Sequence, residues 1–391
     1  MINNSLAIIK RMIAHSSLLL AKPHLIFAVG WGYFRTLILN KPTLRTVEFS
    51  INTDCQSECE MCYSTQNVSD SSPELSLEEI RRIWREAKKL GAFSSVISGG
   101  EPTLRKDLLA VLEAIEARRY IVAMTTNAIA LNKEKLSQLK EAGLGTIHFS
   151  LDSLNAEEND RIRGYKGHFT QVEKCVDWAK DLGFNVALST VAGTNDQLKV
   201  QKMIDYCKGK KIALVLSLAC ATGEWAGQLD KNVTVQEWDL YNQMMSNNPF
   251  MRSDWNINMS LKNECPGGRE KVAVSAYGDI TTCPMNPVSY GNLRKKSLND
   301  IREKMILSPE IAKRTDKCLI GSDHEYIRDY MAPIANFREY PVFIDDHPIN
   351  TGKVDSSKLK GTEGVPSLKA RMLARENSVA ITRDLEKTSS K

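Results

Sequence analysis

The feature that most constrains this 391-residue chain is the stretch CQSECEMCY, which places three cysteines at Cys55, Cys59 and Cys62. They follow the apolar run VEFSI, so a strand ending near Asn52 would deliver three sulfurs on one short loop. Three thiolates on one loop can hold three irons of a [4Fe–4S] cluster and leave the fourth iron open. Zinc is the alternative, because CxxC also occurs in zinc ribbons, usually with a second CxxC or a His pair. The sequence has no such second pair nearby and therefore favours an iron–sulfur cluster.

Three further stretches follow the cysteines in order. They are SGGEPTLRKDL at 98–108, TTNA at 125–128, and SLDS at 150–153 followed by RIRGYKGHF at 161–169. With the C-x3-C-x2-C spacing, this series resembles the radical S-adenosylmethionine (radical SAM) superfamily over residues 46 to about 335. Met61 departs from the family, which usually has an aromatic residue there, and the resemblance implies that its backbone contacts adenine.

The resemblance implies S-adenosylmethionine as a cofactor whose amine and carboxylate chelate the open iron. The cofactor-binding residues that it implies are Gly99, Gly100, Glu101 and Pro102 for the methionyl amine, Ser150, Asp152 and Arg163 for the ribose and carboxylate, and Thr126 and Asn127 for cofactor or substrate. Independently of the resemblance, paired glycines let a backbone approach a ligand closely. A plain glycine turn before a proline-started helix explains the glycines alone, but not their match to the cysteine loop.

From residue 46 to 225 the pattern alternates between strand-like and helical segments. The apolar runs are VEFSI at 47–51, SVIS at 95–98, YIVAMTT at 120–126, TIHFSLD at 146–152, NVALSTV at 185–191 and IALVLSL at 212–218. Six such units predict an α/β fold with a parallel sheet and right-handed crossovers, which the pattern alone leaves open between a doubly wound sheet and a barrel. The family resemblance implies a partial (β/α)6 barrel with its chemistry at the carboxyl ends of the strands, where every motif above falls.

A second cysteine set follows in residues 226–335. Cys265 and Cys283 flank a predicted hairpin with the turn Tyr277-Gly278-Asp279, and Cys318 follows. This pattern resembles the twitch or SPASM extension, a small α+β unit, and implies one auxiliary [4Fe–4S] cluster. Gly321 stands where a closing CxxC would place a cysteine, so the fourth iron is left open, bound by water, or ligated by Asp323 or His324. Cys175 is expected in the core, whereas Cys220 has no partner base in the sequence and receives no role.

The two ends of the chain are basic. Residues 1–47 carry six Lys or Arg and no Asp or Glu, and the tail from Thr351 carries nine basic and five acidic residues. Residues 1–45 read as amphipathic helices with aromatic residues, which suit an interfacial membrane contact. Helices packed beneath the barrel, or an organellar transit peptide, are the alternatives. Residues 336–391 read as a partly flexible tail.

These features predict a cytoplasmic enzyme, with peripheral contact at the inner face of the membrane. The resemblance implies reductive cleavage of S-adenosylmethionine to a 5′-deoxyadenosyl radical that abstracts a hydrogen atom, with flavodoxin or ferredoxin as electron donor. The expected substrate is a small or lipid-linked molecule, with a peptide as the alternative and a non-catalytic zinc or iron–sulfur protein as the rival class. The body's acidic balance argues against nucleic acid. No side chain is singled out as catalytic, and His148 is left unassigned.

Overall fold

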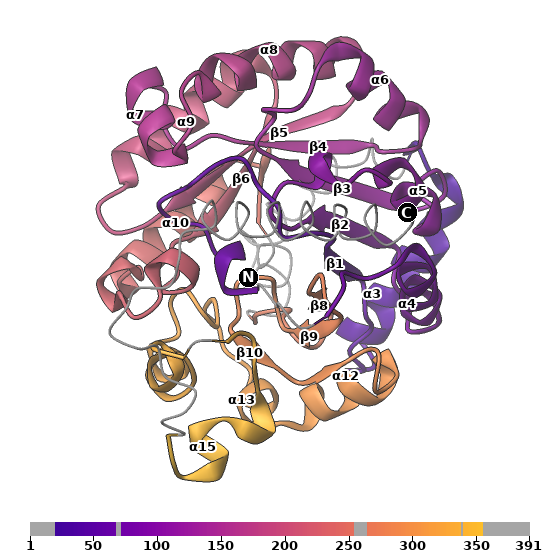
Figure 1. Ribbon diagram of the computed structural model, residues 1–391, viewed down its shortest axis with the longest axis vertical. Helices are drawn as coiled ribbons and strands as arrows, with labels where there is room; N and C mark the ends of the chain where they lie inside the picture. Colours follow the sequence, from indigo (N-terminus) through magenta and orange to yellow (C-terminus); the bar gives the residue numbers. More distant parts are fainter. Residues whose placement is uncertain (1–19, 68–71, 254–263, 338, 355–391) are drawn as a thin grey trace, which may run out of the picture.

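The computed structural model describes residues 20–67, 72–253, 264–337 and 339–354. Within these residues, one sheet has the strand order β11-β9-β8-β1-β2-β3-β4-β5-β6-β7. Every pairing from β8 through β1 to β7 is parallel, whereas β9 pairs antiparallel with β8 and β11. The sheet curves with its covering helices on the outside (Figure 1). The expected α/β fold with an open, partial barrel is confirmed.

The six expected barrel strands are present within a residue or two of the apolar runs. They are β1 Thr46–Ser50, β2 Ser94–Ser98, β3 Ile121–Thr126, β4 Thr146–Ser150, β5 Asn185–Ala192 and β6 Ala213–Leu218. The helices between them are α4 Leu77–Lys89, α5 Leu108–Ala114, α6 Lys133–Glu141, α7 Ala156–Arg163, α8 His168–Asp181 and α9 Gln197–Lys210. Short helical turns are η1 Pro23–Leu25, η2 Ser64–Asn67, η3 Pro102–Leu104, η4 Gly223–Trp225 and η5 Leu229–Lys231.

Helix α4 illustrates how local sequence builds the barrel wall. Ser76 accepts a hydrogen bond from the Glu79 amide, and the Glu79 carboxylate accepts one from the Ser76 amide, so two otherwise unpaired donors are satisfied. Its apolar residues recur at helical spacing, and Ile80, Ile83 and Trp84 are fully buried against the sheet. The same alternation of buried and exposed faces continues around the barrel.

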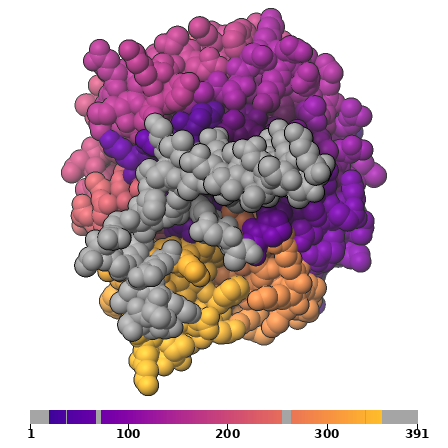
Figure 2. Space-filling view, viewed as in Figure 1, coloured from indigo at the N-terminus to yellow at the C-terminus, as the bar shows by residue number. Residues whose placement is uncertain are grey.

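Residues after 225 extend both edges of the barrel sheet. Helix α10 Val235–Asn247 leads to β7 Met251–Arg252, which pairs with β6, while β8 Lys271–Val274 pairs with β1 and turns into β9 Asp279–Thr281. The remaining elements are β10 Val288–Ser289, β11 Gly291–Asn292, α12 Leu298–Leu307, α13 Pro309–Ala312, α14 His324–Tyr326, η6 Ile327–Met331, η7 Ala332–Ile334, β12 Val342–Phe343, η8 Ile344–Asp346 and α15 Pro348–Thr351. Figure 2 shows this orange and yellow part packed directly beside the purple and magenta barrel.

The described part of the N-terminal segment forms helix α3, Ile26–Leu37. Tyr33 on this helix accepts a hydrogen bond from the Arg45 guanidinium at 3.1 Å, which ties α3 to the start of β1. Phe27, Trp31 and Phe34 remain 80%, 49% and 43% exposed on it. Among the described helices, none is long and apolar enough to cross a membrane. The first predicted amphipathic helix and most of the predicted tail lie outside the described residues.

Candidate functional site

An open cavity of about 210 Å³ lies at the carboxyl ends of the barrel strands. It is lined by the cysteine loop, the Gly-Gly-Glu turn and the inward-facing residues of β1 to β6, so residues from every barrel strand meet there. Of the predicted cofactor-binding residues, the cavity is lined by Met61, Gly99, Gly100, Glu101, Thr126, Asn127, Ser150 and Arg163. Pro102 and Asp152 do not line it: Pro102 begins η3, and Asp152 lies behind Arg163.

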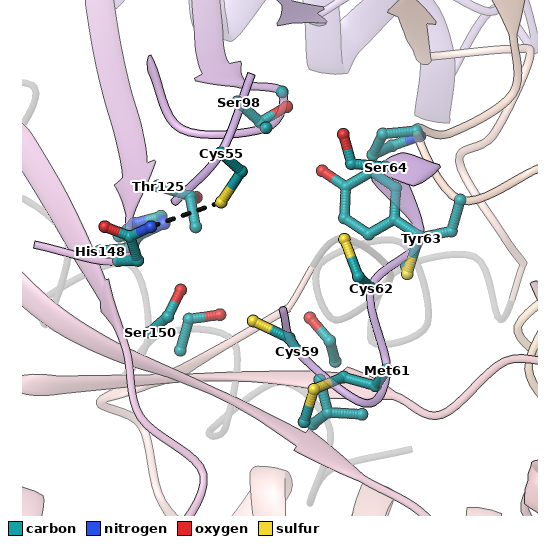
Figure 3. Close-up of a pocket in the computed structure, with 18 of the residues that line it drawn as sticks. Cys55, Cys59, Met61, Cys62, Tyr63, Ser64, Ser98, Thr125, His148 and Ser150 are labelled. Atoms are coloured by element: carbon teal, nitrogen blue, oxygen red, sulfur yellow. Dashed lines mark hydrogen bonds between the residues drawn. The ribbon is translucent and has the colours of Figure 1, made fainter. Parts of the chain in front are cut away.

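The three cysteine sulfurs of the loop point into this cavity (Figure 3). Asn127 Nδ2 lies 3.5 Å from the Cys55 sulfur, and the Arg163 guanidinium lies 3.9 Å from that of Cys59. Burial raises the pKa of all three thiols, that of Cys62 to about 12. Iron binding must therefore displace protons, and the bound cations remove the cost of burying thiolates.

The donor set suits a cluster better than a single ion. Among the described residues, no three His, Cys, Asp or Glu side chains converge on a position that one metal ion could occupy. A [4Fe–4S] cluster needs no such convergence, because each thiolate binds a different iron. Cys55, Cys59 and Cys62 could each bind one of three irons, while the remaining volume of the cavity lies open beside them.

Close backbone approaches hold the cysteine loop from three directions. A Cβ at Gly100 would lie 2.3 Å from the Asp54 carbonyl oxygen, one at Gly164 would lie 2.4 Å from that of Glu58, and one at Gly223 would lie 2.0 Å from that of Cys62. No side chain fits at such distances, so these glycines are required for the contact. The Gly-Gly-Glu turn, the end of α7 and the segment after β6 thus fix the loop's path.

Glu101 organises the turn beside the cluster site. Its carboxylate is 1% exposed and accepts hydrogen bonds from the Thr103 amide at 3.0 Å, the Thr126 hydroxyl at 2.7 Å and the Asn127 amide at 2.7 Å. Burial raises the Glu101 pKa, while these hydrogen bonds oppose the rise. The backbone N–H of Asn127 donates its hydrogen bond to Oε2 of Glu101. A carboxylate oxygen has more than one lone pair, so Oε2 can still accept a hydrogen bond from an incoming ammonium group.

Arg163 is held over the cavity by a buried carboxylate. It forms an ion pair with Asp152, whose other oxygen accepts a hydrogen bond from the Val191 amide at 2.8 Å. The Asp152 amide donates to Asn159 Oδ1 at 3.1 Å, and Asn159 Nδ2 lies 2.9 Å from His168 Nδ1. Burial, aided by the Arg163 charge, lowers the His168 pKa to about 4, so His168 is neutral and positions this network.

Several cavity residues had no role assigned from the sequence. They are Glu48, Tyr63, Ser64, Ser98, Thr125, His148, Ser189, Ser217 and Cys220. The alternation of side chains along each strand could have identified some of these residues as facing the cavity. His148, for example, lies on the same face of β4 as Ser150. Figure 3 shows the side chains of Thr125, His148 and Ser150 on the same wall, opposite Tyr63.

The second cysteine set lines its own smaller cavity of about 40 Å³. Cys265, Cys283 and Cys318 line it, and the β8–β9 hairpin lies between the first two, as predicted. Met285 lines both cavities and forms part of the wall between them. Neither predicted alternative ligand lines this cavity: Asp323 accepts a hydrogen bond from the Tyr326 amide, and His324 is exposed.

Comparison with known proteins places this geometry in a family. The Radical SAM superfamily profile matches residues 49–207. PqqA peptide cyclase of Rhizobium meliloti is 27% identical over 46% of this chain and 48% of its own. GTP 3′,8-cyclase of Mannheimia succiniciproducens is 30% identical over 61% of this chain and 77% of its own.

The chain spans about half the length of several curated relatives that it matches. Among solved structures, Streptococcus suis SuiB bound to precursor peptide SuiA aligns with a TM-score of 0.55 and 19% identity. That alignment covers 67% of this chain and 65% of SuiB. At this identity it supports the fold.

Proposed function

The chain belongs to the radical SAM superfamily and is an enzyme, and from this premise we propose that it cleaves S-adenosylmethionine reductively and abstracts a hydrogen atom from a small polar substrate. The observation that carries the proposal is the cavity itself, into which three cysteine sulfurs point (Figure 3) and which the Gly-Gly-Glu turn and Arg163 also line. A cluster bound there with S-adenosylmethionine would supply the electron that breaks the sulfonium C–S bond and yields the 5′-deoxyadenosyl radical.

The protein's own groups bind and orient the cofactor. Glu101, whose Oε2 already accepts from the Asn127 backbone N–H, would bind the methionyl ammonium, and Arg163, paired with Asp152, would bind the carboxylate. Gly99 and Gly100 would let the backbone approach the cofactor, Ser150 would bind the ribose, and the backbone of Met61 would bind adenine. Gly99, Glu101 and Ser150 are buried, and exclusion of water there would protect a reactive radical from side reactions.

The cavity wall favours a polar substrate without phosphate groups. Its described lining includes the hydroxyls of Thr125, Ser189 and Ser217 together with His148, all of which can bind hydroxyl or amine groups. Arg163 is the one Lys or Arg in that described lining, and the cofactor carboxylate uses it. A nucleoside triphosphate would need several basic groups. A peptide is the second candidate, because PqqA peptide cyclase and the SuiB complex are both peptide-linked by name.

We also propose that Cys265, Cys283 and Cys318 bind an auxiliary [4Fe–4S] cluster. All three line one small, mostly apolar cavity, and burial raises the Cys318 pKa strongly, which argues against a bare thiolate there. The nine cysteines all lie within the described residues, and none is disulfide-bonded, which suits a reducing, cytoplasmic compartment with flavodoxin or ferredoxin as electron donor.

Peripheral membrane contact through α3 completes the proposal. Phe27, Trp31 and Phe34 are exposed on one short helix, and residues 1–47 contain basic but no acidic side chains. A Phe27→Ser/Trp31→Ser variant should lose binding to vesicles containing anionic lipid in a sedimentation assay. Equal sedimentation of the variant and the natural chain would refute the contact.

The central test is an anaerobic assay of the reconstituted protein with S-adenosylmethionine and dithionite, with iron and sulfide counted in the same sample. The natural chain should release 5′-deoxyadenosine and contain about eight irons, since each cluster holds about four. The Cys55→Ala/Cys59→Ala/Cys62→Ala variant should lose about four irons and all cleavage. Cys207→Ala, which removes a buried thiol on α9 away from either cavity, is the matched control. Cleavage that survives the triple substitution would refute the assignment.

A further inference from the structure

Cys220 is a buried thiol that the proposed function leaves without a role. It lies two residues beyond the end of β6, is 6% exposed, and lines the main cavity. Its sulfur lies 3.3 Å from the carbonyl oxygen of Leu218, so the side chain folds back along its own segment toward the strand end. The smaller cavity of the second cysteine set adjoins the main cavity at Met285, which lines both.

The loop that carries Cys318 packs directly on this strand end. A Cβ at Gly321 would lie 3.0 Å from Leu218 Cβ and 3.3 Å from the Cys318 sulfur, so that sulfur and the end of β6 meet at Gly321. Asn232 donates hydrogen bonds to the carbonyl oxygens of Ile320 and Gly321, at 2.9 and 3.2 Å, and holds the loop there. Packing at Gly321 therefore fixes the Cys318 loop against the end of β6, just before Cys220, and the hydrogen bonds fix the same loop to Asn232.

All four cysteines, Cys220, Cys265, Cys283 and Cys318, are wholly or partly buried, although they lie up to about a hundred residues apart in sequence. Unmetallated thiolates would be costly in such surroundings.

The other candidate donors lie elsewhere. The Asp323 carboxylate caps α14 through the Tyr326 amide at 3.2 Å, and the His324 side chain is exposed. A cysteine at position 321 would press against Leu218, because even its Cβ would be closer than ordinary contact. The side of Cys318 from which a CxxC partner would approach is therefore filled by β6, the strand that ends just before Cys220.

We propose that Cys220 is the fourth thiolate ligand of the auxiliary cluster, in place of Asp323, His324 or an open iron. The inference rests on the proposed function, because it requires Cys265, Cys283 and Cys318 to hold that cluster. Four thiolates leave no iron open, so substrate does not bind at this cluster. Because Cys220 also lines the main cavity, the closed cluster borders the reaction space through its own ligand. This border suits electron exchange with the substrate region.

The experiment isolates the auxiliary cluster in the full-length Cys55→Ala/Cys59→Ala/Cys62→Ala chain, which retains the second cysteine set and Cys220 besides the core thiols Cys175 and Cys207. Cys220→Ala and Cys220→Ser are added singly, and iron, sulfide and electron paramagnetic resonance are measured before and after mild ferricyanide oxidation. A three-thiolate cluster loses its unligated iron on oxidation, whereas a four-thiolate cluster resists this loss. We expect the parent to keep about four irons per chain, and Cys220→Ala to fall to about three with the spectrum of a three-iron cluster.

The controls separate the ways in which this inference can fail. Cys207→Ala and Asp323→Ala/His324→Ala, each in the same parent, should behave like the parent, and circular dichroism verifies that each variant is folded. Parent-like oxidation resistance in folded Cys220→Ala would overturn the Cys220 assignment and leave the auxiliary cluster intact. Absence of iron in the parent would overturn the auxiliary cluster itself.

Discussion

Gly164 and Gly167 share one loop and the same left-handed backbone, with φ of +62° and +86°. A Cβ at Gly164 would strike the Glu58 carbonyl at 2.4 Å, whereas a Cβ at Gly167 would meet nothing within 4 Å. Gly167→Ala should therefore cost about 1 kcal/mol, the left-handed penalty. Gly164→Ala should cost about 2 kcal/mol more through overpacking, and should lower the iron content because Glu58 lies within the cysteine loop.

Urea unfolding and iron analysis of both variants test this comparison. Equal losses of stability and equal iron contents in Gly164→Ala and Gly167→Ala would show that contact with the cysteine loop has no energetic role.

His168 should make stability depend on pH. Its pKa is lowered from 6.5 to about 4 in the folded protein, so the unfolded chain binds more protons between these values. Stability is therefore highest above pH 6.5 and falls as pH drops, by up to about 3 kcal/mol near pH 4 from this group alone. His168→Gln should flatten the curve of urea-unfolding free energy against pH. If the natural chain and His168→Gln lose the same unfolding free energy between pH 7 and pH 5, His168 is not a buried neutral group.

At this scale the sequence predicted which residues line the cavity better than how they reach it. Glu101 lines the cavity because its motif follows β2, whereas Arg163 reaches the cavity from the end of helix α7. Asp152 was predicted to contact cofactor, yet it lies behind Arg163, since alternation gives the face of a residue and not its depth. Cys220 carried no local pattern, because its neighbours come from segments distant in sequence.

Strands β1 and β8 are joined by a buried ion pair. Lys271 Nζ lies 2.8 Å from Glu48 Oε2, and the two side chains are 5% and 10% exposed. Ser98 donates a further hydrogen bond to Glu48 Oε1 at 3.1 Å. Lys271→Met leaves a buried carboxylate without its cation and should cost about 3 kcal/mol of unfolding free energy.

The matched double variant Glu48→Gln/Lys271→Met removes both charges and should recover most of that loss in urea unfolding. A double variant that is as unstable as Lys271→Met alone would mean that packing, not charge, joins the two strands.

The βα alternation predicted the elements well and their long-range pairing poorly. The predicted runs 47–51 and 212–218 differ from β1 and β6 by only one residue at an end. They could be predicted because the apolar pattern of a buried strand and the capping residues of a helix lie within the element's own sequence. The hairpin turn at Gly278, with φ of +92°, was equally local. The parallel pairing of β8 with β1 joins segments more than two hundred residues apart and depends on tertiary packing. The local pattern of apolar residues therefore could not predict this pairing.

At the scale of the whole molecule, barrel and C-terminal part share one sheet. The Arg45 guanidinium bonds Glu270 at 2.7 Å, and Arg302 donates to the Pro42 carbonyl oxygen at 2.8 Å, across the same boundary. A fragment of residues 1–225 would lose β8 and leave β1 as an unpaired edge. We expect it to aggregate or unfold without a cooperative transition, whereas the full chain unfolds cooperatively.

Thermal unfolding followed by circular dichroism, with light scattering on the same samples, tests this expectation. A soluble 1–225 fragment with a sharp transition would show that the barrel is an independent folding unit.

The three glycines around the cysteine loop also set an order of events during synthesis of the chain. The loop emerges from the ribosome early, but Gly164 and Gly223 follow it by roughly one hundred and one hundred and sixty residues. Until Gly164 and Gly223 have been synthesised and β6 has joined the sheet, the cysteine loop lacks part of the backbone that packs against it. Iron delivered to a nascent chain would meet exposed thiols on a loose loop. We expect insertion of the first cluster to follow completion of the barrel, so a delivery factor would need to act on an almost folded protein.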